Sequence, residues 1–211
     1  MAFTLYNGRA TWDAAGRVTA SGGNGTISVS LSTTNPVVSR VGGTPTIITF
    51  SRSGDTQSSL MVNYSLRGNA VAGQDFQLSP GNSGTTVSIP AGAASANLQI
   101  LPLASTNFMR GLALHFAVAA ASSYQLGNPV AVDLTISGNT VPASLKMSPQ
   151  GTLLTWPSIS NKQYRIGYKN NLTDQVWTPI GQVTATNSTS SWADNTVTPV
   201  RQRFYLVAQV N

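Results

Sequence analysis

Runs in which apolar and polar residues alternate strictly are the feature that most restricts the fold of this chain. The clearest run is 26–32, and the runs 60–66, 112–118 and 130–136 keep the same period. A period of two places successive side chains on opposite faces, which is typical of a strand with one buried face. No stretch keeps the 3.6-residue period of an amphipathic helix. The pattern therefore predicts an all-β protein built from antiparallel strands.

The composition agrees with this prediction. The 211 residues include no Glu and only three Lys, while apolar residues make up 41% and charged residues 9%. Soluble helices use Glu and Lys heavily, so helix bundles and doubly wound α/β folds are excluded. Turn-forming residues separate the alternating runs at short intervals, at 53–55, 67–69, 80–82 and 90–92. This spacing is typical of β-sandwiches.

Residues 137–142 interrupt the pattern with Ser, Gly, Asn and Pro, which end strands and favour turns. We therefore predict two tandem, antiparallel, Ig-like β-sandwiches, at 36–138 and 144–211, joined by a linker at 139–143. Residues 1–35 remain as an N-terminal arm with a predicted β-hairpin. An isolated hairpin is marginal in water, so the arm needs a docking surface. It either completes a sheet of its own chain or adds a strand to another subunit, and we slightly favour a contact in trans.

The charge is positive, with 12 Lys and Arg against six acids and a formal net charge of +6. Residues 144–211 carry six of the cations and two of the acids, so the basic character belongs mainly to the second predicted sandwich. The cations are dispersed and no nucleic-acid-binding motif is present, so we expect protein partners rather than nucleic acid. The sequence has no Cys, no stretch long enough to span a membrane and no signal-peptide pattern at its start. We expect either a protein outside the usual export route or one whose signal was removed.

Five segments in the first predicted sandwich have a recognisable order and spacing. They are TIITFSRSG at 46–54, VNYSL at 62–66, AVAGQDF at 70–76, VSIPAG at 87–92 and LQI at 98–100. Together they resemble a Calx-beta domain, a β-sandwich that serves as a calcium-binding and adhesive module in exchangers, integrins and bacterial surface proteins. The resemblance implies the same sandwich fold for residues 36–138.

The calcium ligands implied by that resemblance are missing from this sequence. The family usually supplies a Glu before the first strand and an acidic loop after the strand that corresponds to 98–100, because calcium needs several carboxylate oxygens. This chain has Ser39 and Arg40 at the first place and a loop without acids at 104–111. Asp75 remains, but one carboxylate seldom holds calcium, and we expect it to cap a turn. We therefore predict no metal and no cofactor.

Four segments of the second predicted sandwich carry a further resemblance. They are GTLLTWP at 151–157, YRIGYK at 164–169, WTPIG at 177–181 and RFYLV at 203–207. They resemble the short fibronectin type III-like modules that end many secreted bacterial proteins. A Trp on an early strand opposite a Tyr-x-Ile-x-Tyr strand is what a small sandwich uses to fill its centre. The resemblance implies a spacer or binding platform and not an enzyme.

No combination of residues predicts catalysis, so we expect no catalytic site. His115 is the only histidine, and the alternation places it on the outer face of a strand, where a solvated side chain is the simplest interpretation. Serine is abundant, but neither a second histidine nor a Gly-x-Ser-x-Gly elbow accompanies it.

Exposed aromatic side chains provide the alternative, a stacking platform for sugars. Tyr164, Tyr168, Trp177 and Trp192 are candidates, although core packing is the simpler role for most of them. The platform that we predict consists of Trp192, Tyr168 and Arg201.

The sequence thus predicts a non-enzymatic structural or adhesive surface protein, either a subunit or decoration protein of a virion, such as a phage, or part of an extracellular assembly. Its location would be the virion surface or the cell surface. Its partner would be a second copy or a larger particle, contacted through the arm. The alternative is a secreted carbohydrate-binding accessory module of a bacterial surface protein, with a glycan as ligand.

Overall fold

The computed structural model describes residues 26–81, 85–105, 108–148, 151–196 and 202–210. These residues form 17 strands, β1 to β17, and one 3₁₀ turn, η1 (Val41–Gly43). The all-β class predicted from the alternation is confirmed. Within the described ranges no helix has the length and apolar character needed to cross a membrane.

Strands β1 to β10 form two five-stranded sheets that face one another. The sheets have the orders β5-β7-β3-β1-β9 and β2-β10-β8-β4-β6. The strands are β1 (Ser28–Thr33), β2 (Val37–Val38), β3 (Thr46–Ser53), β4 (Leu60–Gly68), β5 (Phe76–Ser79), β6 (Thr86–Ile89), β7 (Ser95–Pro102), β8 (Leu112–Val118), β9 (Gln125–Leu126) and β10 (Ala131–Ile136). Neighbouring strands pair antiparallel, except that β1 with β9 and β10 with β2 pair in parallel.

Three aromatic rings lie at the centre of this first sandwich. Tyr64 stacks on Phe116 with ring centroids 4.6 Å apart, and the ring of Phe50 lies 5.8 Å from each. All three side chains are buried, as the alternation of their strands requires. His115 lies on the outer face of β8 as predicted, where its Nδ1 is 2.7 Å from Oδ1 of Asp133 on β10.

Strand β1 is an integral part of the first sandwich. It pairs with β3 from Ser28 to Thr33, and Val29 and Leu31 are fully buried. Our preference for a contact in trans is therefore wrong for this strand, because it completes a sheet of its own chain. The hairpin predicted in the arm, at 3–12 and 17–20, lies outside the described residues.

Residues 140–209 form a second sandwich whose sheets share no strand with the first. The sheets have the orders β11-β17-β14-β15 and β12-β13-β16. The strands are β11 (Thr140–Val141), β12 (Ser144–Ser148), β13 (Gly151–Pro157), β14 (Gln163–Lys169), β15 (Thr178–Thr184), β16 (Thr189–Asp194) and β17 (Phe204–Gln209). Trp156 and Tyr164 fill the core with ring centroids 5.9 Å apart, so Tyr164 is a packing residue. The likeness to fibronectin type III modules stays a prediction.

The chain changes from one sheet of the second sandwich to the other at Pro142. Before it, Thr140 and Val141 pair with β17, and after it β12 pairs with β13 in the opposite sheet. Proline has no backbone N–H to donate to a ladder, which favours a break at this point. The predicted linker at 139–143 therefore contains the short strand β11.

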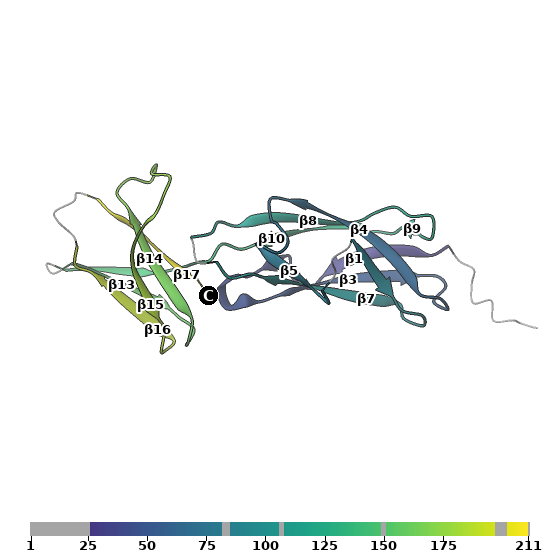
Figure 1. Cartoon of the computed structure of the whole chain (residues 1–211), viewed down its shortest axis with the longest axis horizontal. Helices are drawn as coiled ribbons and strands as arrows, with labels where there is room; N and C mark the ends of the chain where they lie inside the picture. The colour runs from purple at the N-terminus through teal and green to yellow at the C-terminus, as the bar shows by residue number, and fades with distance from the viewer. Residues whose placement is uncertain (1–25, 82–84, 106–107, 149–150, 197–201, 211) are drawn as a thin grey trace, which may run out of the picture.

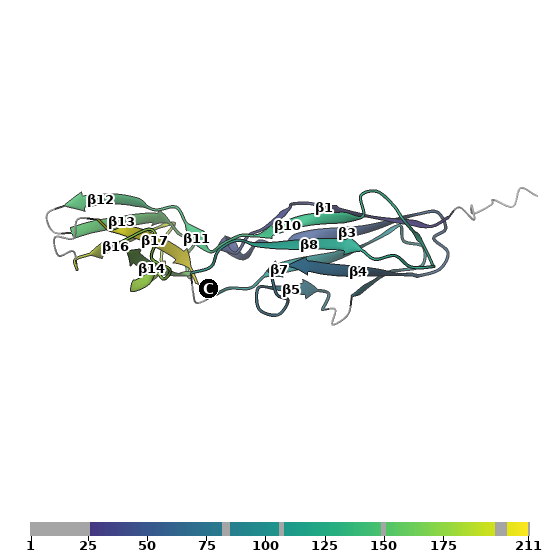
Figure 2. The same ribbon diagram turned by 90° about the horizontal axis from the view of Figure 1, so that it is seen from above.

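The two sandwiches lie end to end and form an elongated molecule (Figures 1 and 2). The buried residue Asn139 joins them. Its side-chain Oδ1 accepts a hydrogen bond from the Met109 amide, and its carbonyl oxygen accepts one from the Gln209 amide, each at 2.8 Å. The Gln209 side chain in turn accepts a hydrogen bond from the Gly42 amide. Polar groups buried in this way hold the sandwiches together at the junction.

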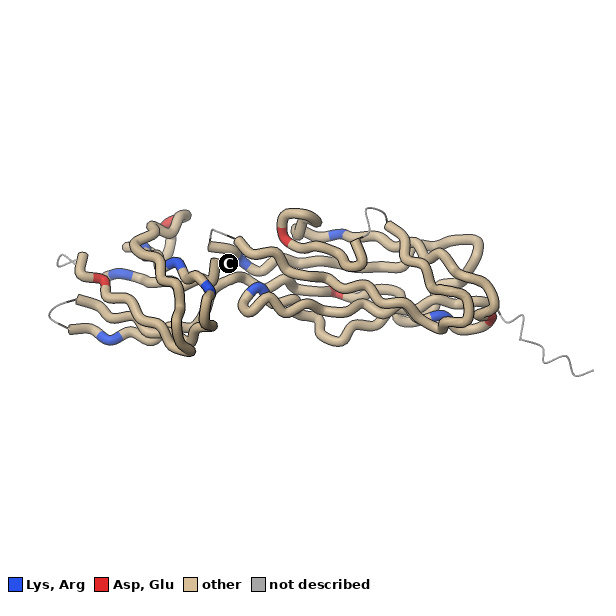
Figure 3. Tube along the Cα trace, turned by 60° about the horizontal axis from the view of Figure 1, so that its bottom comes forward, with Lys and Arg blue, Asp and Glu red and all other residues tan. Residues whose placement is uncertain are grey.

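In the part of the chain that the structure describes, the Lys and Arg residues are spread along the molecule and do not gather in one stripe (Figure 3). Some of them bind groups of their own chain. The buried Arg52 guanidinium donates hydrogen bonds to the carbonyl oxygens of Thr56, Ser58, Pro90 and Ala93. Part of the positive net charge therefore serves the fold.

Asp194, at the end of β16, is a buried carboxylate with several donors. The amide and hydroxyl of Thr196, the Tyr205 hydroxyl and Nη1 of Arg203 lie 2.6 to 2.9 Å from its oxygens. Burial by itself raises the pKa of this carboxyl, but the hydrogen bonds outweigh it and lower the pKa from 3.8 to about 2. The guanidinium of Arg203 also stacks 3.9 Å from the ring centre of Tyr168.

Acid should therefore weaken the second sandwich through Asp194. The native pKa lies below that of the unfolded chain, so the stabilisation is complete above about pH 4 and is lost as the pH falls toward 2. It amounts to about 2 kcal/mol. We expect the difference in unfolding free energy between the native chain and Asp194→Asn, from urea titrations, to shrink by about this amount across that range. A difference for Asp194→Asn that stays constant across this pH range would contradict the assignment.

Candidate binding cleft at the junction of the sandwiches

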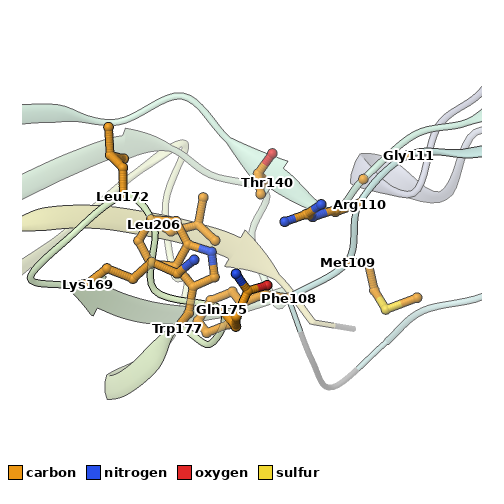
Figure 4. Close-up of a pocket in the computed structure, with 11 residues that line it drawn as sticks. Phe108, Met109, Arg110, Gly111, Thr140, Lys169, Leu172, Gln175, Trp177 and Leu206 are labelled. Carbon is orange, nitrogen blue, oxygen red and sulfur yellow. The ribbon is translucent and has the colours of Figure 1, made fainter.

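A cleft of about 550 Å³ opens where the two sandwiches meet (Figure 4). The loop before β8, the segment that joins the sandwiches at 138–140 and the second sandwich all contribute to it. The lining residues are Phe108, Met109, Arg110, Gly111, Gly138, Thr140, Lys169, Leu172, Gln175, Trp177 and Leu206. This volume lies within the range of pockets that hold small ligands.

Phe108 fixes the loop of the first sandwich against the second. Its ring lies over Gly167 in β14, where a Cβ atom would come within 2.6 Å of the Phe108 ring. Real Cβ atoms do not approach so closely, so only glycine leaves room for the ring. Trp177 adds a second contact, with its ring centroid 6.3 Å from that of Phe108. The contact joins segments almost sixty positions apart in the sequence.

Trp177 forms the aromatic wall of the cleft. Nζ of Lys169 lies 4.8 Å from the centre of the indole and donates a hydrogen bond to the carbonyl oxygen of Asp174. Asp174 closes the loop before Trp177, because its carboxylate accepts the Asn171 amide at 3.0 Å. The cation and the loop therefore hold the indole in place.

The polar groups of the cleft are mostly hydrogen-bond donors. Arg110 extends into the cleft from the first sandwich, and Gln175 and Trp177 face it from the second (Figure 4). Thr140 adds a hydroxyl at the rim, and no carboxylate or imidazole belongs to the lining. An aromatic face beside a guanidinium, an amide and a hydroxyl can bind a polar ring, and the guanidinium favours a ligand with a carboxylate. The lining holds no pair of groups suited to general acid and base catalysis.

The predicted platform residues lie elsewhere. Trp192 is half-buried on β16 and covers Gly181, where a Cβ atom would come within 2.5 Å of the indole. The ring of Tyr168 lies beneath Arg203. Arg201 lies outside the described residues. Neither Trp192 nor Tyr168 lines the cleft, so their role as a platform stays a prediction.

An ion pair occupies the positions where the resemblance to Calx-beta domains implies calcium ligands. Nη2 of Arg40 lies 2.7 Å from Oδ1 of Asp75, and the arginine side chain is only 1% exposed. Oδ2 of Asp75 accepts the Val71 amide at 2.8 Å, which confirms the predicted turn-capping role. In the described ranges no three residues among His, Asp, Glu and Cys are grouped as metal ligands. The Arg40 partner of Asp75 was not foreseen.

Calcium should leave the stability of the first sandwich unchanged, because Arg40 and the Val71 amide already occupy the Asp75 carboxylate. We expect equal melting temperatures in millimolar calcium and in chelator, measured by circular dichroism. Asp75→Asn should lower the melting temperature equally in both buffers. A reproducible rise of several degrees with calcium would contradict the prediction, since a ligand that binds the native state raises its stability.

Three solved structures illustrate what this chain is similar to. The apo-form Calx CBD1 domain is 20% identical, with a TM-score of 0.41 over 53% of this chain and 96% of that one. CBD12 from CALX1.2 is 15% identical, with a TM-score of 0.44 over 79% and 75%. A chain of the chaperone–tip adhesin complex of CFA/I fimbriae biogenesis is 7% identical, with a TM-score of 0.34 over 79% and 89%. No protein-family model and no curated protein matches the sequence. The strand pairings themselves establish the β-sandwich architecture.

Proposed function

We propose that this chain is a non-enzymatic structural or adhesive surface protein, as a subunit or decoration protein of a virion or of an extracellular assembly. The observation that carries the proposal is the fixed end-to-end coupling of the two sandwiches. Phe108 sits on Gly167, and Asn139 is hydrogen-bonded to both units. A rod of this kind holds its two ends a constant distance apart, which suits a spacer or an assembly subunit.

The distribution of charge supports protein contacts over nucleic-acid contacts. A phosphate backbone is bound by clustered cations, whereas the Lys and Arg residues that the structure describes lie apart along the rod (Figure 3). Arg40, Arg52 and Arg203 are engaged with carboxylates or carbonyl oxygens of their own chain. This distribution supports a protein surface as the partner, either a second copy of this chain or a larger particle.

The full chain should self-associate, or should sediment with a virion or cell-envelope fraction. Phe108→Ala should weaken this association by about tenfold or more, because the two ends of the rod are no longer held in fixed relation. Sedimentation velocity over a range of concentrations measures the effect, and Met61→Ala, an exposed change on β4, is the control. A chain that stays monomeric and sediments with no particle would contradict the proposal.

A second candidate function is carbohydrate binding, and the cleft favours it. Trp177 presents an aromatic face to a space that also contains Arg110 and Gln175, so the lining suits a sugar ring that carries a carboxylate. The cleft belongs to the junction, so this ligand would require both sandwiches.

A glycan array and titration calorimetry test the second function. Trp177→Ala should weaken the binding of an acidic sugar by about tenfold, which corresponds to about 1.4 kcal/mol. Arg110→Gln should remove the preference for acidic over neutral sugars. Trp192→Ala is the matched control, because Trp192 lies outside the cleft. Loss of binding in Trp192→Ala alone would place the site on the predicted platform, and no binding by the native chain would exclude this function.

A further inference from the structure

In the sheet β11-β17-β14-β15, the short strand β11 pairs with only part of one edge of β17. β11 pairs with β17 at Val207 and Ala208, and no described strand pairs with Phe204 to Leu206 on that side. The Gln209 amide points to this edge, where it bonds Asn139, while the Val210 amide points to β14. Backbone groups alternate along a strand, so the N–H and C=O of Tyr205 also point to the uncovered edge. They form an open template for a further strand.

The opposite sheet has an uncovered apolar face beside this edge. Leu145 and Met147 on β12 lie opposite Leu154 and Thr152 of β13 and share their face. Leu154 and Thr152 are buried, yet Leu145 is 55% and Met147 is 83% exposed. They are exposed because β11 ends at Val141, so the opposite sheet does not extend over them. A gap therefore lies between β17 and β12 that none of the described strands fills.

The sequence contains a segment suited to this gap. Residues 1–7 read MAFTLYN, so Met1, Phe3 and Leu5 alternate with Ala2, Thr4 and Tyr6 and would share one face of a strand. A strand with this pattern could place its apolar face on Leu145 and Met147 while its backbone pairs with Tyr205. The 25 residues before Thr26 can span about 80 Å when extended, which is ample reach.

The position of β1 makes a second copy the more direct target for the segment. β1 begins at the end of the first sandwich that lies away from the second, and β12 lies in the second sandwich at the other end of the rod (Figures 1 and 2). To enter the gap of its own chain, the arm would have to run back along both sandwiches. A second copy placed beyond that end would present its gap on the same side as the start of β1, so the arm would not have to pass along its own sandwiches.

We infer that residues 1–7 of one copy add a strand to β17 of a second copy, over Leu145 and Met147, so that the chain assembles head to tail. The inference rests on the proposed role as an assembly subunit and names its contact. Because the same contact repeats at every copy, the copies form an open filament unless their rotation closes them into a ring.

Disulfide trapping tests this contact in the full chain. The chain has no Cys, so introduced thiols are the only ones present. Mixing Leu5→Cys with Met147→Cys under mild oxidation should give a cross-linked pair of the two variants. Met61→Cys is the matched control for the acceptor, because Met61 is also an exposed methionine (54%) but lies on β4. The double variant Leu5→Cys, Met147→Cys should give a ladder of multimers on a non-reducing gel.

Substitutions in the arm provide a second readout by sedimentation velocity. Leu5→Asp should weaken self-association by about tenfold or more, while Thr4→Asp, on the opposite face of the predicted strand, should leave it nearly unchanged. A synthetic peptide of residues 1–12 should compete with assembly of the native chain.

The outcomes separate this inference from the proposed function. Self-association with cross-linking no better than that of the Met61→Cys control would overturn the inference and leave the assembly role standing. A cross-linked monomer from the double variant would show that the arm fills its own gap, and would overturn the contact between copies. A chain that neither associates nor binds a particle would overturn both.

Discussion

The change of sheet at Pro142 is the constraint on which the second half of the molecule depends. Before this proline the chain runs along β17 for two residues, and after it the chain belongs to the opposite sheet. The early crossing keeps Asn139 and β11 at the junction, where Asn139 bonds the loop of the first sandwich and the end of β17. It also leaves the start of β17 and the inner face of β12 without a covering strand.

The junction between the sandwiches and the gap beside β17 both follow from the change of sheet at Pro142, but the first is closely packed and the second is open. At the junction, Gly167 lets Phe108 contact the backbone of β14, so two sandwiches that could otherwise swing are held together. The cleft is a by-product of that contact, because its walls come from the loop that carries Phe108 and from the loop before Trp177. In the gap, by contrast, Met147 is exposed although the residue opposite it is buried.

Local patterns predicted much of the fold. The alternation in 112–118 correctly placed Phe116 in the core and His115 outside it, since a strand's period determines its faces. The turn around Asp75 was also predictable, because an Asp side chain commonly bonds the backbone nearby. Such predictions succeed because they depend on neighbours in the sequence.

Long-range contacts were not predictable in the same way. The pairing of Arg40 with Asp75 and the position of Phe108 on Gly167 depend on how sheets and loops meet in space. The pairing of β1 with β3 was missed because an alternating strand gives no sign of its partner. Trp177 was one of four aromatic candidates, and only the loop held by Lys169 and Asp174 singles it out.

Hydrogen exchange at Tyr205 tests most directly whether the second sandwich is completed by another copy. In dilute solution the Tyr205 amide should exchange fast, because it points to the uncovered edge, while that of Val207, next to β11, should be protected. At concentrations where the chain self-associates, the Tyr205 amide should become protected and that of Val207 should not change. Protection of Tyr205 at every dilution, or fast exchange that persists in the assembled state, would contradict the account.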